Sequence, residues 1–126
     1  MNLFASIRAR FAIPSDYFNG VSTLNEVQIP HGVTSIKERA FSDCTNLTSV
    51  TIPSSVTSIG KEAFYKCNSL TSVEIGDNVI SISPHAFYGC SSLTNIEIPN
   101  SVTSIGYSAF SSCSGLARVV IPDSVT

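Results

Sequence analysis

Residues 47–69 read LTSVTIPSSVTSIGKEAFYKCNS, and residues 70–92 repeat the same pattern as LTSVEIGDNVISISPHAFYGCSS. Cysteine recurs with the same step of 23 residues, at Cys44, Cys67, Cys90 and Cys113. Alanine-phenylalanine pairs and columns of leucine, isoleucine and valine recur with this step as well. A unit this short cannot bury its apolar face alone, so the repeat predicts a solenoid in which each unit packs on its neighbours.

Each repeat has the pattern of two short strands and a turn. The last four residues of 47–53 alternate apolar and polar side chains, with Leu47 as a further inward residue, which is typical of a strand that Pro53 ends. Residues 54–60 form a second β-branched stretch. Residues 61–67 contain better helix formers and predict a single helical or 3₁₀ turn. Stacked repeats would pair equivalent strands in parallel and turn the apolar columns into one core.

The 23-residue unit, Ile-Pro-x-x-Val-x-x-Ile-Gly-x-x-Ala-Phe-x-x-Cys-x-x-Leu-x-x-Val-x, resembles the BspA-type leucine-rich repeat family. The match covers residues 29–126 as four full repeats and the start of a fifth, with Gly76 replacing the proline and Ser83 replacing the glycine. This resemblance implies a right-handed, mainly β solenoid with a parallel sheet stacked along its body. It also implies surface proteins of host-associated bacteria and mucosal protozoa, many of which bind proteins as adhesins. The spacing itself indicates neither a compartment nor a ligand.

The two ends of the chain depart from the repeat. Residues 13–28 carry a degenerate first repeat, and residues 1–12 have an apolar helical face that predicts an amphipathic N-terminal cap. A membrane-surface helix or signal segment is the alternative for residues 1–12. At the other end the sequence stops early in the fifth repeat, so we expect an open rung. Either the chain is a fragment of a longer array, or Ile121 and Val125 support self-association.

Composition and charge exclude several classes of function. The chain is 43% hydrophobic and 13% charged, with a net charge of -2 and no stripe of Lys or Arg, which argues against a nucleic-acid partner. Every apolar run is interrupted long before the ~20 residues of a spanning helix, so we expect no membrane insertion. His31 and His85 lie in different columns, without a second histidine or a carboxylate at ligand spacing. With no phosphate-binding glycine loop either, we expect no catalytic residue, cofactor or metal site.

The cysteine column permits three interpretations. Equivalent residues of neighbouring rungs lie within reach of a disulfide, and a ladder of thiolates could hold metal. However, stacked equivalents point their side chains in parallel, and Val21 occupies this column in the first repeat. We therefore predict reduced thiols that pack as small apolar groups.

The outer face of the longer strand supplies the candidate contact residues. Alternation points the residues on either side of Val50 and its equivalents outward. The candidates for binding a protein or glycan partner are Ser49, Thr51, Ser72, Glu74, Asn95, Glu97 and Arg118.

Glu74 and Glu97 stand in one column of this face and form a like-charge pair about one strand spacing apart. Either the pair is solvated and offset diagonally by Arg118, or it is an acidic spot for a ligand. The sequence thus predicts a non-enzymatic protein-interaction or adhesion module, with a self-assembling structural module as the alternative. The resemblance suggests a cell-surface or secreted location, although no signal peptide is recognised in the sequence.

Overall fold

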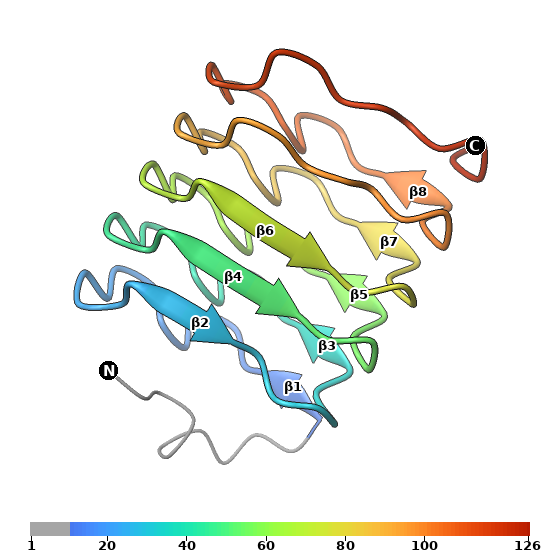
Figure 1. Cartoon of the computed structure of the whole chain (residues 1–126). Coiled ribbons are helices and arrows are strands. Elements are labelled where there is room, and N and C mark those ends of the chain that lie inside the picture. Colours follow the sequence, from blue (N-terminus) through green and yellow to red (C-terminus); the bar gives the residue numbers. More distant parts are fainter. Residues whose placement is uncertain (1–10) are drawn as a thin grey trace.

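The computed structural model describes residues 11–126, which form a stack of rungs with the first and last described residues at opposite ends of the stack (Figure 1). One parallel sheet has five strands, in the order β1 (Ala12–Ile13), β3 (Ser35–Ile36), β5 (Ser58–Ile59), β7 (Ser81–Ile82) and β8 (Ser104–Ile105). The other has three, in the order β2 (Glu26–Gln28), β4 (Ser49–Ile52) and β6 (Ser72–Ile75). The predicted solenoid of stacked parallel strands, with two strands in a rung, is confirmed.

Neighbouring strands of each sheet are one repeat apart and pair in register. In the three-stranded sheet Val27 lies opposite Val50, and Val50 opposite Val73. A step of 23 residues therefore places each side chain over its equivalent in the rung before it. The rings of neighbouring phenylalanines stack 5.2 Å apart and nearly parallel, as Phe41 does on Phe64. The apolar columns thereby form one continuous core.

The segment predicted as a helical or 3₁₀ turn is instead a run of tight turns. Within residues 62–67 every second amide closes a turn of its own rung, as Ala63 N–H does by donating to Gly60 O (3.1 Å). The amides between them donate to the next rung, as Phe64 N–H does to Ala86 O (2.8 Å). A helix would use these amides within the segment and leave the rungs unbonded here. The alternation requires left-handed backbone, and Glu62 accordingly has φ 57°.

Most of the predicted N-terminal cap, residues 1–12, lies outside the described residues. Of its described part, Phe11 is 71% exposed and Ala12 begins β1. The degenerate first repeat follows, and its Phe18 and Leu24 are buried in the core. In residues 11–126 the structure has no helix long and apolar enough to cross a membrane.

The three-stranded sheet ends at β6, while the five-stranded sheet continues to β8 (Figure 1). In the earlier rungs Thr48 N–H donates to Asn25 O (2.6 Å), and Thr71 N–H donates to Thr48 O (2.9 Å). Among residues 11–126 no ladder bond joins residues 94–98 to β6. Beyond β6, the rungs are thus hydrogen-bonded through the five-stranded sheet but not through the three-stranded one.

Candidate functional site

The outer face of the three-stranded sheet is small and polar. Ser49 lies next to Ser72 and Thr51 next to Glu74, because β4 and β6 pair in register. Ser72 and Glu74 are exposed, whereas Ser49 and Thr51 are half-buried. Val73, between Ser72 and Glu74, points the other way and is 8% exposed. Four of the candidate contact residues therefore share one continuous surface.

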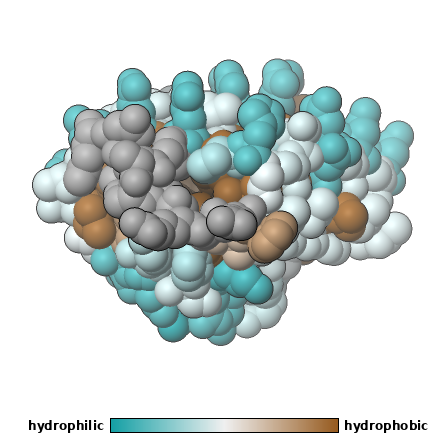
Figure 2. Space-filling view, turned by 90° about the horizontal axis from the view of Figure 1, so that it is seen from below, coloured by the Kyte–Doolittle hydropathy of each residue, from teal (hydrophilic) through white to brown (hydrophobic). Residues whose placement is uncertain are grey.

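The molecule viewed along the stack is mostly hydrophilic or neutral, with isolated hydrophobic patches (Figure 2).

The other three candidates lie beyond the ladder. Asn95 and Glu97 are exposed on residues 94–98, and Arg118 is exposed on the following rung. Since residues 94–98 do not pair with β6, Glu97 is not the ladder neighbour of Glu74, and the expected pair at one strand spacing is wrong. Within the described chain Arg118 forms no ion pair, so no salt bridge joins it to Glu97.

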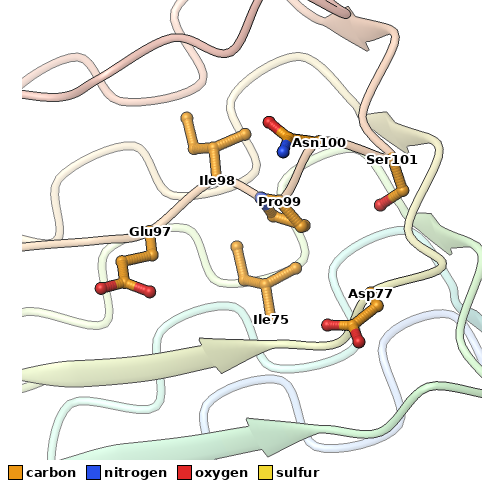
Figure 3. Close-up of a pocket in the computed structure, with 7 residues that line it drawn as sticks. All are labelled: Ile75, Asp77, Glu97, Ile98, Pro99, Asn100 and Ser101. Carbon is orange, nitrogen blue, oxygen red and sulfur yellow. The ribbon is translucent and has the colours of Figure 1, made fainter.

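A groove opens where the ladder ends, between β6 and residues 94–101. Its first part, of about 440 Å³, is lined by Ser72, Val73, Glu74, Ile75, Asn95 and Glu97. Its second part, of about 400 Å³, is lined by Ile75, Asp77, Glu97, Ile98, Pro99, Asn100 and Ser101 (Figure 3). Both parts share Ile75 and Glu97, and together they are called the β6 groove below.

The charge on the two walls of the groove opposes pairing of the ladder at this point. In register, the Glu74 and Glu97 carboxylates would stand one strand spacing apart on the same face, where like charges repel. Thr51, the equivalent residue one rung earlier, is uncharged, so Thr51 and Glu74 pair without such repulsion. Separation of the walls also partly uncovers Ile75, which is half-buried, whereas its equivalent Ile52 is 2% exposed.

Gly76, which follows β6, allows the chain to lie close to the rung that precedes it. A Cβ at Gly76 would lie 2.6 Å from Pro53 O, so only glycine permits this approach of the chain to the preceding rung. The repeat places a proline at this position in the other rungs. Glycine therefore permits β6 to lie close to the preceding rung, and β6 pairs with β4 but not with residues 94–98.

Comparison with known proteins settles which repeat this is. A family model described as a BspA type leucine rich repeat region matches residues 12–126 in six copies. The chain belongs to the BspA-type leucine-rich repeat family. A search of curated proteins finds no match to it.

Solved structures of similar leucine-rich repeat proteins agree with this assignment. The Treponema pallidum leucine-rich repeat protein is 39% identical, with a TM-score of 0.80 over 82% of this chain and 50% of that one. A leucine-rich cell surface protein of Faecalibacterium prausnitzii is 42% identical, with a TM-score of 0.77 over 80% of this chain and 27% of that one. A Bacteroides ovatus leucine-rich repeat protein is 36% identical, with a TM-score of 0.76 over 81% and 29%. This BspA-type chain spans about half the length of these proteins or less.

The cysteines of this BspA-type solenoid form an inner column. All four are buried and unbridged, and each thiol donates to the carbonyl of a phenylalanine in the preceding rung, as Cys67 does to Phe41 O with Sγ 3.0 Å away. Burial raises the pKa of the Cys44 thiol to about 11 and raises the pKa of Cys67 as well. The column is packed inside the core as predicted. In residues 11–126 no group of three or more His, Cys, Asp or Glu side chains is placed to hold a metal ion.

Sequence reasoning missed an aromatic cluster on the turns of the BspA-type repeat. The rings of Tyr65 and Tyr88 stack at 5.2 Å, and His85 meets the edge of Tyr107 at 5.1 Å. Tyr107 is 68% exposed. The signal was present in part, because Tyr65 and Tyr88 stand exactly one repeat apart. Tyr107 falls in a different column, so the repeat alone could not bring it to His85.

Arg39 forms ion pairs with three carboxylates on the turns. Its Nε lies 2.8 Å from Asp16 Oδ1, and its other nitrogens lie 3.3 Å from Glu38 and 3.4 Å from Glu62. Hydrogen bonding to Arg39 holds the pKa of Asp16 below its usual range. Arg39, Glu62 and His85 stand in one column of the repeat, and Glu62 is bound by Arg39.

Proposed function

We propose that the chain is a non-enzymatic interaction module that binds a protein or glycan through the outer face of the three-stranded sheet. The observation that carries this proposal is the continuous surface of Ser49, Thr51, Ser72 and Glu74, held in register by the β4–β6 ladder. Solenoids bind partners on extended sheets of this kind, because stacking gives a long surface of fixed geometry.

The chemistry of this face suits contacts. Short hydroxyl side chains lose little conformational freedom on binding and offer both donors and acceptors. Asn95, Glu97 and Arg118 extend the face beyond the ladder with an amide and two charges. The relative from Faecalibacterium prausnitzii is described as a cell surface protein, which supports an adhesive role at a surface for this chain as well.

A steric block tests the face. The wild-type chain is applied to an array of immobilised proteins and glycans, and Ser49→Trp is expected to weaken binding of its ligands by about tenfold or more. Ile80→Trp is the matched control, because Ile80 is 51% exposed and lies beside β7 of the five-stranded sheet. Circular dichroism verifies that both variants are folded. Equal losses in the two variants would place the binding surface elsewhere.

Self-association is the second candidate, and exposed apolar residues near the last described rung favour it. Val120 and Ile121 are 67% and 52% exposed, while Val125 is half-buried and packs against the core. Light scattering over a hundredfold range of concentration would reveal an oligomer, and Ile121→Lys is expected to abolish it. A constant monomer mass across that range would remove this candidate.

A further inference from the structure

The β6 groove has an unpartnered backbone edge, unlike the interior of the sheet. The Thr48 carbonyl accepts a hydrogen bond from Thr71 N–H at 2.9 Å, but in residues 11–126 the Thr71 carbonyl receives none from Thr94. Unpaired peptide groups at the edge of a sheet are a template on which another extended segment can pair. The groove therefore offers backbone hydrogen bonds to an extended segment.

The walls of the groove combine apolar and acidic side chains. Ile75 and Ile98 lie side by side at its centre, with Glu97 on one side and Asp77 on the other (Figure 3). Glu74 lines the first part of the groove together with Glu97. Within the described chain none of these three carboxylates forms an ion pair, since the ion pairs there all involve Arg39. The occupant that complements such walls has an apolar stem and a cationic end.

We propose that the β6 groove receives an arginine carried by an extended segment of a partner protein. The stem of the arginine packs against Ile75 and Ile98, and its planar guanidinium donates paired hydrogen bonds to the carboxylates at the ends of the groove. The backbone of the segment bonds to the open edge of β6. This inference rests on the proposed function and names the chemistry of the partner.

Arginine fits the groove better than the other occupants of similar size. A neutral glycan would leave three carboxylates without a counter-charge, and an acidic segment would add to their repulsion. Lysine supplies the charge, but its compact ammonium cannot form the paired contacts of a guanidinium. The volume of each part, about 440 Å³ and about 400 Å³, suits a single long side chain with its neighbouring backbone.

The test uses three labelled peptides that differ at one position, namely Gly-Thr-Val-Arg-Val-Thr-Gly and its Lys and Glu counterparts. Fluorescence anisotropy at low and high salt measures their binding to the full chain. We expect the Arg peptide to bind more tightly than the Lys peptide, the Glu peptide to show no binding, and high salt to weaken the Arg peptide.

Two isosteric variants locate the contact. Glu97→Gln removes one charge inside the groove and is expected to weaken binding of the Arg peptide by about tenfold. Glu26→Gln is the matched control, because Glu26 is exposed on β2 of the same sheet and lies outside the groove. Similar binding of the Arg and Glu peptides, no detectable binding of the Arg peptide, or an unchanged affinity in Glu97→Gln would each overturn the inference. If a ligand from the array no longer binds Ser49→Trp but still binds Glu97→Gln, the proposed function stands and the proposal of a bound arginine is rejected.

Discussion

Phe64 stands in the middle of the phenylalanine column, and Phe64→Ala tests whether the rungs are stabilised by one shared core. The side chain is fully buried, and the rings of Phe41 and Phe87 stack on it from both sides at 5.2 Å. Truncating a buried phenylalanine costs about 3–5 kcal/mol, which includes the cavity left behind. Domains of this size are stable by about 5–15 kcal/mol, so the variant should lose a third or more of its free energy of unfolding.

Urea unfolding followed by circular dichroism measures this loss. With a slope of about 1–3 kcal/mol per molar urea, the midpoint should fall by about 2 M. Phe110→Ala is the matched control, because Phe110 is half-buried and stacks on Phe87 alone, at 5.5 Å. Its loss should be about half as large. A shift of under about 1 kcal/mol for Phe64→Ala, or equal shifts in the two variants, would refute a core built of stacked rungs.

Other positions test the thiol column, the close approach of rungs and the groove. Cys44 should resist a thiol reagent in the native protein near neutral pH and react after denaturation, because burial raises its pKa to about 11; rapid native labelling would contradict this. Since the unfolded thiol loses its proton first, the Cys44 contribution to stability is complete below about pH 9 and is lost as the pH rises through 11, by about 2–3 kcal/mol. Thermal melts at both ends of that range, with Cys44→Ala as control, measure it. Gly60→Ala should lower the free energy of unfolding by about 1–3 kcal/mol, because its Cβ would lie 2.7 Å from Ile36 O; calorimetry showing an unchanged melting temperature would argue against this approach. Glu97→Thr should raise the stability by about 0.2–1 kcal/mol in urea unfolding by removing the repulsion from Glu74, and a loss would reject that repulsion.

The candidate site could be predicted in part. Alternation within the strand identified the outward side chains of β4 and β6, because a strand points successive residues to opposite faces whatever surrounds it. The sequence also located Glu74 and Glu97 in one column. It could not show that the ladder would end between them, since that depends on the packing of two particular rungs.

The sequence by itself determined the solenoid, its 23-residue rungs, the in-register columns and the inner position of the cysteines. These features follow from periodicity, because a side chain that recurs at a fixed step must meet its own equivalents once the units stack. The tertiary structure alone decided how the backbone and the charged side chains behave within the stack. The tight turns at residues 62–67 depend on amides that bond to the next rung, which the apolar pattern does not encode. Arg39 and Glu62 share a column, as do Glu74 and Glu97, but only the structure shows that the first pair forms an ion pair and that the ladder ends between the second. A repeat pattern determines which residues stack, whereas the interaction of each stacked pair depends on its own side chains.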